Sequence, residues 1–350
     1  MHLTLIIPEL LWPEPGDALT LADLPAEHFS WLFSRANFSC QPAESYENLL
    51  LQEFQRLDGQ LAVLRGRGEN PPLYLNAPSL CADPVHLRFH QERIVLADAG
   101  AFDLDAEESA AFIQALNTEF SALGCFHATN AKRWYLELHK PIPHPAAPLS
   151  RVAGRRLDGE VDGKTTPLYR WLNEVQMFLH QHPLNAARAQ RGQVAVNSLW
   201  LWGEQKPSAR PAPSNAPSNT APPYDQVFAQ DPIARGLALE AGISLSDLPT
   251  SAHHVLQENR QRPLVYLDTL RPGVLYENPD DWQSAFGRLE QDWLRPLRAQ
   301  LGKRVRRLDL IAPCIYGVLR ATLQGNARWQ FWKNRAPYQP QALAQGLAQH

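Results

Sequence analysis

The sequence predicts an α/β fold, with helices flanking a layered, largely parallel sheet. Strand-like and helix-like segments alternate along much of the chain, which is typical of parallel sheets with helical crossovers. An apolar run at residues 3–7 predicts a first strand that ends at Pro8, because proline lacks a backbone donor. A composition of 44% hydrophobic and 20% charged residues is typical of a packed globular protein.

A chain of 350 residues is long enough for two domains. Its net charge of -3 offers no broad basic surface to nucleic acid or to an anionic membrane. No apolar run approaches the ~18 residues that span a bilayer, so we expect a cytoplasmic protein with neither nucleic-acid nor membrane partners. The four scattered cysteines indicate buried thiols rather than a metal site or a disulfide framework.

Helices and short strands follow in the first half of the chain. Helical spacing extends over residues 19–64, where Ser45 can cap a helix. Asp105 is expected to cap a second helix that reaches Phe120, and residues 134–138 alternate as a strand. Short β-like pieces lie between these helices at residues 73–75, 86–89 and 93–96. We expect a small mixed α/β unit here.

The second half continues the alternation of helices and strands. A helix opens at Pro167 and stops near Pro183, and a strand follows at residues 194–202. Residues 207–223 are rich in proline, serine, alanine and asparagine, which predicts a linker or mobile loop. Beyond this segment we expect helices at residues 231–242 and 280–301 and strands at residues 263–268 and 307–312.

A group of amide and basic residues follows the helix that opens at Pro167: His182, Asn185, Arg188 and Arg191. A short helix would bring the two arginines to one side, where paired guanidiniums suit a phosphate or a carboxylate. A solvated helix face is the alternative interpretation. Asn197 lies in a strand before two tryptophans, either as a pocket floor or at a bulge.

A second pair of basic residues, His86 and Arg88, alternates along a predicted strand and therefore points to one side. Together they could hold an anion, although an ordinary polar contact of the histidine is the alternative. The usual glycine-rich nucleotide motifs, zinc-protease motifs and serine-hydrolase motifs do not occur in the sequence.

Residues 172–203, together with ADPVHLR at residues 82–88, resemble the RpfE-type regulatory proteins of proteobacteria. The residues that carry a more distant similarity, to archaeal-type cofactor-independent phosphoglycerate mutases, are His182, Pro183, Asn185, Arg188, Gly192 and Asn197. The resemblance implies an alkaline-phosphatase-like core at residues 1–79 and 204–350. It also implies an inserted substrate-binding-like domain at residues 80–203.

Mutases of that superfamily hold two divalent metals, but this sequence departs from their pattern. Pro8 and Glu9 occupy the expected aspartate position, and only Asp268 and Asp309 remain near expected metal positions. Two carboxylates cannot fix two ions. The resemblance therefore implies a bacterial pseudoenzyme with no catalytic residue, metal or cofactor.

On this interpretation the protein is regulatory or binds a metabolite. The expected ligand is a phosphorylated or carboxylated small molecule, with candidate contacts at His86, Arg88, His182, Asn185, Arg188, Arg191 and Asn197. One alternative is an active mutase or phosphatase that uses Mn or Mg. Another is a pure protein-interaction protein that docks a protein partner through residues 207–223.

Overall fold

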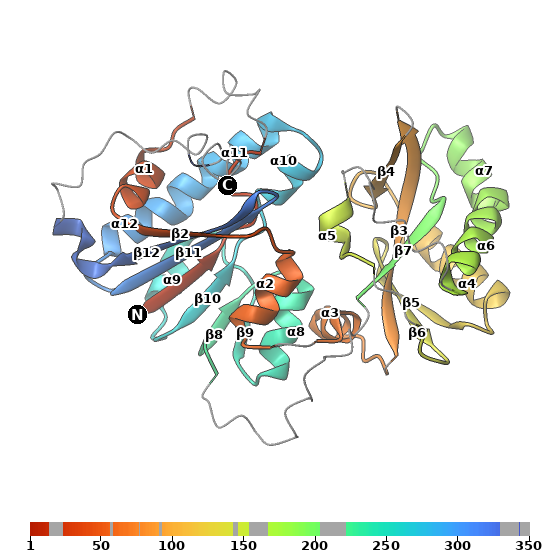
Figure 1. Cartoon of the computed structure of the whole chain (residues 1–350), viewed down its shortest axis with the longest axis horizontal. Coiled ribbons are helices and arrows are strands. Elements are labelled where there is room, and N and C mark those ends of the chain that lie inside the picture. Colours follow the sequence, from red (N-terminus) through yellow and green to blue (C-terminus); the bar gives the residue numbers. More distant parts are fainter. Residues whose placement is uncertain are drawn as a thin grey trace. The chain divides into compact units, whose positions relative to one another are not determined.

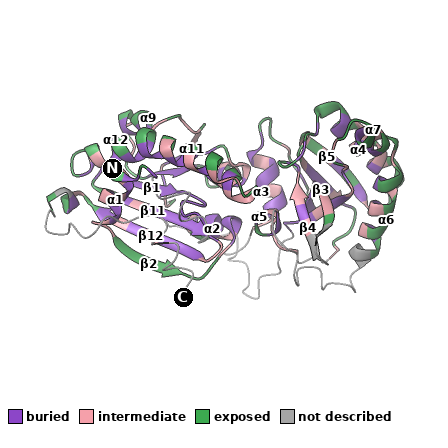
Figure 2. Ribbon diagram, turned by 90° about the horizontal axis from the view of Figure 1, so that it is seen from above, coloured by how far each residue is buried: buried purple, intermediate pink, exposed green. Residues whose placement is uncertain are grey.

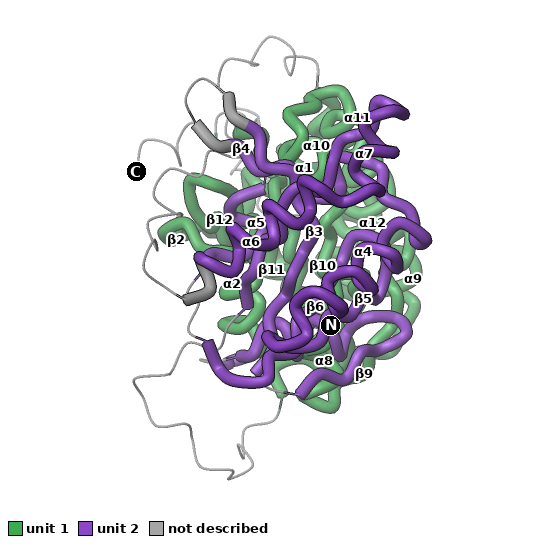
Figure 3. Tube along the Cα trace, turned by 90° about the vertical axis from the view of Figure 1, so that its right-hand side faces the viewer, with its two compact units in different colours: residues 1–54, 218–350 green, residues 55–217 purple. Residues whose placement is uncertain are grey.

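The computed structural model describes residues 1–13, 24–56, 59–76, 78–90, 93–142, 146–153, 167–203, 222–329 and 343. The chain forms two compact units (Figure 3): unit 1 contains residues 1–54 and 218–350, and unit 2 contains residues 55–217. Unit 2 thus interrupts unit 1 in sequence. The predicted linker at residues 207–223 lies almost entirely outside the described residues.

Unit 1 is built on a seven-stranded sheet in the order β2-β12-β11-β1-β10-β8-β9 (Figure 1). Its strands are β1 (His2–Ile6), β2 (Asn37–Gln41), β8 (Gln226–Phe228), β9 (Ser244–Ser246), β10 (Pro263–Tyr266), β11 (Arg307–Cys314) and β12 (Gly317–Gln324). Strands β1, β8, β9, β10 and β11 pair in parallel, whereas β12 and β2 are antiparallel. The prediction of an α/β fold is confirmed, and the sheet of unit 1 is largely parallel.

Helices pack on both faces of this sheet. One face forms a large apolar core with α1 (Glu27–Phe33), α9 (Ala252–Gln257), α11 (Pro279–Leu289), the π-helical turn η2 (Glu290–Leu294) and α12 (Arg295–Gln300). Helices α2 (Tyr46–Glu53) and α8 (Pro232–Glu240) contact each other. They lie on the opposite face, where Glu53 of α2 accepts a hydrogen bond of 2.6 Å from Arg320 of β12. Figure 2 shows the buried central strands and the exposed edge strand β2.

Side-chain caps begin several of the helices where the sequence predicts them. Ser45 Oγ accepts a hydrogen bond from the backbone of Asn48, and the Asp105 carboxylate accepts one from the backbone of Glu108. Asp231 caps α8 in the same way, with two bonds of 2.9 Å. Within the described ranges, no helix combines the length and the apolar character needed to cross a membrane.

Unit 2 contains a five-stranded antiparallel sheet. The strands are β3 (Ser79–His90), β4 (Arg93–Asp98), β5 (Gly124–Asn130), β6 (Arg133–Leu138) and β7 (Ser198–Trp202). Its apolar core joins the sheet to α4 (Ala106–Glu119) and α6 (Pro167–Gln181), with Leu184 of α7 (Pro183–Gln190) at its margin. The short helix α5 (Leu149–Val152) belongs to the same unit. The predicted β-like piece at residues 73–75 is not a strand.

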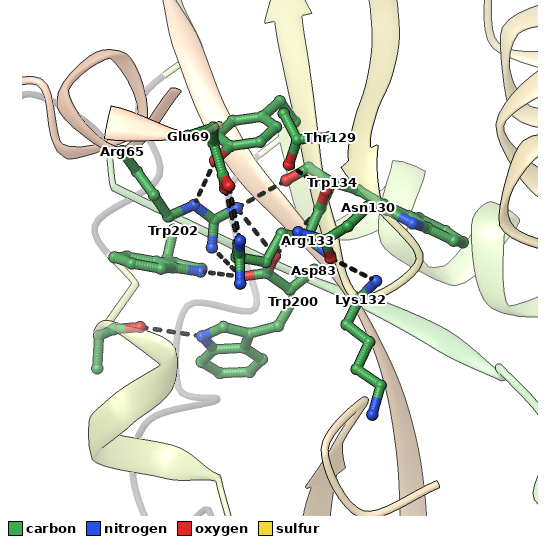
Figure 4. A network of polar contacts seen from close by, with 12 residues as sticks. Arg65, Glu69, Asp83, Thr129, Asn130, Lys132, Arg133, Trp134, Trp200 and Trp202 are labelled. Carbon is green, nitrogen blue, oxygen red and sulfur yellow. Dashed lines mark hydrogen bonds and ion pairs between the residues drawn. The ribbon is translucent and has the colours of Figure 1, made fainter. Parts of the chain in front are cut away.

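Helix α3 (Leu61–Gly68) packs against β3 through a buried ion pair (Figure 4). Arg65 donates to both carboxylate oxygens of Asp83, at 2.7 and 2.9 Å, and its guanidinium lies 4.5 Å from the ring centroid of Tyr135. Asp83 also accepts a bond of 2.8 Å from the indole of Trp202. These contacts attach α3 to the sheet of unit 2.

Burial alone would lower the pKa of Arg65, and the nearby Asp83 carboxylate raises that pKa well above its ordinary value. The network continues to Glu69, which accepts two bonds from Arg133, at 2.7 and 2.6 Å, and one of 2.6 Å from Tyr135. The charges inside this face of unit 2 are therefore paired and hydrogen-bonded, as buried charges must be.

Strand β1 is held at its first residue by Asp309 of β11. His2 Nε2 lies 2.5 Å from Asp309 Oδ2, Thr322 donates to Oδ1 at 2.6 Å, and Arg307 donates to the same oxygen at 3.1 Å. Burial raises the pKa of Asp309, but these hydrogen bonds outweigh burial and hold the pKa below its ordinary value. Asp309 is the register partner of Thr4 and lies five residues before the carboxyl end of β11, away from the carboxyl edge of the sheet.

Acid should weaken this contact in a predictable pH window. Because the pKa of Asp309 is lower in the folded state, its contribution to stability is complete above the unfolded pKa. The contribution is lost as the pH falls below the ordinary pKa of an aspartate and through its lower folded pKa. We expect Asp309→Asn to flatten the dependence of unfolding free energy on pH in this window. Urea unfolding of the unmodified chain and of Asp309→Asn at several pH values in this window measures both pH dependences. Equal dependences would contradict the lowered pKa of Asp309.

Candidate functional site

The predicted arginine pair lies at the end of α7, and its two members differ in exposure. The Arg188 side chain is 0% exposed, whereas that of Arg191 is 53% exposed. Both guanidiniums bond to the carboxylate of Glu108 in the first turn of α4. Arg188 also donates to the backbone oxygen of Val194 at 2.8 Å and to that of Asp103. The donors of Arg188 are therefore bonded within the protein.

The two predicted asparagines bind backbone groups. Buried Asn185 donates to the oxygens of Leu179 and Val196, at 2.7 and 2.8 Å, and accepts from the Val196 nitrogen at 3.0 Å. Asn197 exchanges two bonds of 2.8 Å with the backbone of Leu87 on β3. Together they attach the segment between α7 and β7 to its neighbours, which gives Asn185 and Asn197 a structural role in unit 2.

The predicted histidines also contact the protein. His182 is the N-cap of α7, and its ring lies 5.0 Å from that of Phe112, centroid to centroid. Burial lowers the pKa of His182. His86 Nδ1 lies 2.9 Å from the backbone oxygen of Ala195, while Arg88, two residues further along β3, is exposed. Of the seven predicted contacts, Arg88 and Arg191 thus present exposed guanidiniums.

A second group of polar residues lies at the carboxyl edge of the sheet in unit 1. Strand β8 leads into α8 on one face, and its neighbour β10 leads into α10 (Arg271–Leu275) and then α11, which packs on the other face. Connections that leave neighbouring parallel strands toward opposite faces open a crevice at their carboxyl ends, where α/β proteins bind ligands. Asp231 follows β8, and Asp268 follows β10.

Arg271 brings an arginine to this edge. Its guanidinium carbon lies 5.4 Å from the centroid of the Tyr46 ring, over the ring. Burial lowers the pKa of Arg271, but the nearby Tyr46, Tyr266, Glu47 and Asp231 raise it above its ordinary value. Within the described residues, no side chain forms a hydrogen bond or an ion pair with the guanidinium. A guanidinium has five N–H donors in a planar fork, so this residue can bind an oxyanion.

Two groups near Arg271 have shifted pKa values. Burial raises the pKa of Asp268, and Asp231 raises it further, while Arg271 lowers it in part. Burial likewise raises the pKa of Tyr266 well above its ordinary value. Clustered residues with shifted pKa values are typical of functional sites, although structural ion-pair networks also produce such shifts.

The position of Arg271 depends on close packing between α10 and α11. A Cβ atom added to Gly273 would lie 2.7 Å from the Cβ of Trp282 and 2.8 Å from its backbone nitrogen. The indole of Trp282 donates at 2.9 Å to the backbone oxygen of Glu9, directly beyond β1. The glycine thus allows α10, which carries Arg271, to pack against the residue of α11 that bonds to the segment after β1.

Acidic residues at this edge do not form a metal site in the described part of the chain. There, no group of three or more histidine, cysteine, aspartate or glutamate side chains could hold an ion. Buried Glu9 instead accepts a hydrogen bond from Tyr46. Of the two carboxylates that the mutase resemblance places near metal positions, Asp268 lies at the edge and Asp309 does not.

Sequence inspection did not single out Arg271 as a site residue. The sequence does mark its position, since the residue follows a predicted strand and precedes a proline and a glycine, as residues at the carboxyl end of a strand often do. Tyr46 and Glu47 could not be connected to it, because they lie more than 200 residues earlier and only the sheet topology brings them together.

No protein-family model matches the sequence, and neither does any curated protein. The fold resembles that of the PH0037 protein from Pyrococcus horikoshii, with 12% identity, a TM-score of 0.51, and 92% of this chain and 87% of that chain covered. A cofactor-independent phosphoglycerate mutase from Thermoplasma acidophilum has 16% identity and a TM-score of 0.41, with 93% and 90% covered. The likeness to the Pyrococcus protein is one of fold.

Proposed function

We propose that this chain is a regulatory protein that binds a small phosphorylated or carboxylated metabolite, without two-metal catalysis. The observation that carries the proposal is Arg271, whose guanidinium has no bonded partner among the described residues. It lies at the edge where α/β sheets bind ligands. This placement agrees with the ligand class that the phosphoglycerate-mutase resemblance implies.

The charges around Arg271 refine the expected ligand. Arg271 would bind the phosphate or carboxylate through two parallel N–H bonds. The nearby carboxylates would repel a ligand that presented only negative charge, so the ligand should also carry hydroxyl groups. Asp268, whose pKa is raised by burial and by Asp231, could accept a bond from such a hydroxyl. A hydroxylated phosphate or carboxylate therefore fits the group best.

Isothermal titration calorimetry with 3-phosphoglycerate and a panel of phosphorylated metabolites tests this proposal. Arg271→Gln is expected to weaken binding at least tenfold, about 1.4 kcal/mol, since a charge-assisted bidentate contact is lost. Arg288→Gln, which changes an exposed arginine on α11, is the matched control and should bind normally. Equal affinity of Arg271→Gln and the unmodified protein would remove Arg271 from the site.

The exposed guanidiniums of unit 2 are a second proposed location for the same ligand class. Arg191 bonds to Glu108 through Nη2 alone, so its other N–H groups can bind a ligand, and Arg88 is exposed on β3. The same titrations are carried out with an Arg191→Gln variant. A loss of binding in Arg191→Gln but not in Arg271→Gln would assign the ligand to unit 2. Turnover in a coupled mutase assay with added manganese would instead favour an active enzyme.

A further inference from the structure

An apolar segment of unit 2, between α3 and β3, presents two prolines and a tyrosine to solvent. Tyr74 is 75% exposed, more than any other large hydrophobic side chain in the described part of the chain. Pro71 and Pro72 are exposed as well. Single exposed hydrophobic residues are normal in soluble proteins, but here three exposed apolar residues fall within four positions of the chain.

The backbone of this segment is hydrogen-bonded to helix α3. Leu73 donates a hydrogen bond of 2.8 Å to the backbone oxygen of Gly66 in α3, and the Leu75 side chain is buried. A Cβ atom on Gly66 would lie 2.8 Å from the Leu73 oxygen and 3.2 Å from Leu75 Cδ1. The segment therefore contacts α3 closely through Leu73 and Leu75, while Tyr74 between them faces outward.

The far end of the segment is also attached. Asn76 donates a bond of 2.9 Å to Glu137 on β6. Residues 72–76 belong to no helix or strand. An exposed segment that is already ordered loses less conformational entropy on binding, so it is preorganised for recognition.

We propose that Pro71, Pro72, Leu73 and Tyr74 form a docking segment for a partner domain with an aromatic-lined groove. Proline has no backbone N–H and favours the polyproline II conformation, which such grooves bind at low entropic cost. Residues 70–76 contain no charged side chain, so apolar and aromatic contacts must provide the affinity. The order Pro-Pro-Leu-Tyr places a ring three residues from the first proline and two from the second.

The probe is an isolated WW domain, because its groove is built from aromatic side chains and takes proline-rich segments. The full chain is titrated into the labelled domain while the indole N–H resonance of the groove tryptophan is followed by NMR. We expect this resonance to shift with the unmodified chain. Tyr74→Ala and Pro72→Ala should each weaken binding at least tenfold, which corresponds to about 1.4 kcal/mol.

Met177→Ala is the matched control, since Met177 is 65% exposed on α6 of the same unit. It should bind as the unmodified chain does. All variants should unfold at unchanged denaturant concentrations, because the altered side chains are exposed. A groove resonance that does not move, or a Tyr74→Ala variant with full affinity, would overturn the proposal.

Sedimentation of the chain alone distinguishes a second occupant of the segment. We expect the unmodified chain and Tyr74→Ala to sediment with the same mass. A self-associated species that Tyr74→Ala abolishes would overturn the partner assignment and give the segment to a second copy of this chain. The test does not depend on metabolite binding, because none of the proposed ligand contacts, Arg271, Arg191 and Arg88, belongs to the segment of residues 71–74.

Discussion

Replacement of Arg188 by methionine is expected to lower the free energy of unfolding by about 3 kcal/mol, because its hydrogen bonds are lost while Glu108 keeps its bond to Arg191. The variant keeps much of the side-chain volume but removes a fully buried charge from Glu108. It also removes the hydrogen bonds that Arg188 donates to the backbone oxygens of Asp103 and Val194. Urea unfolding followed by circular dichroism measures the loss.

Arg191→Met is the matched control, since it changes the same residue type one helical turn later and removes a bond to the same carboxylate. Its side chain is half exposed, so a loss of about 0–1 kcal/mol is expected. A stable Arg188→Met variant with weakened metabolite binding would instead show that Arg188 serves the ligand. The pair of variants therefore separates a structural role from a binding role for the arginines that the sequence brings together.

The spacing of Arg188 and Arg191 correctly predicts that the two side chains converge, but it does not identify what they meet. Their shared partner, Glu108, lies 80 residues earlier along the chain from Arg188. A polar residue at helical spacing has the same sequence pattern whether its face meets solvent or another helix. Burial depends on the packing of α4 and α7 across unit 2, which periodicity along one segment does not report.

Local signals predict helix starts better than strands. The caps at Ser45, Asp105 and Asp231 arise from hydrogen bonds within a few residues, and all three form. Strand β2 was missed although Phe38 and Cys40 alternate with polar residues, because helical spacing was assigned to the whole of residues 19–64. The predicted helix at residues 280–301 is continuous except that residues 290–294 form a π-helical turn.

Replacement of Asp83 by asparagine should also cost about 3–5 kcal/mol, because it leaves the buried guanidinium of Arg65 without its counter-charge. Asparagine has nearly the same shape as aspartate, so the loss reports charge and hydrogen bonding rather than a cavity. In either orientation, the amide NH2 group would also point at the guanidinium and at a second donor, the Trp202 indole or the Trp134 backbone nitrogen. Urea unfolding followed by tryptophan fluorescence measures this loss.

A double-mutant cycle shows whether Arg65 and Asp83 act as a pair. Arg65→Met combined with Asp83→Asn removes the charge that the single Asp83→Asn change leaves unpaired. The double variant should therefore lose about 2–3 kcal/mol less than the sum of the two single losses. Additive losses would mean that each residue acts through separate contacts, such as the bond from Arg65 to the Trp134 oxygen. Strong coupling would instead show that this ion pair attaches α3 to the sheet of unit 2.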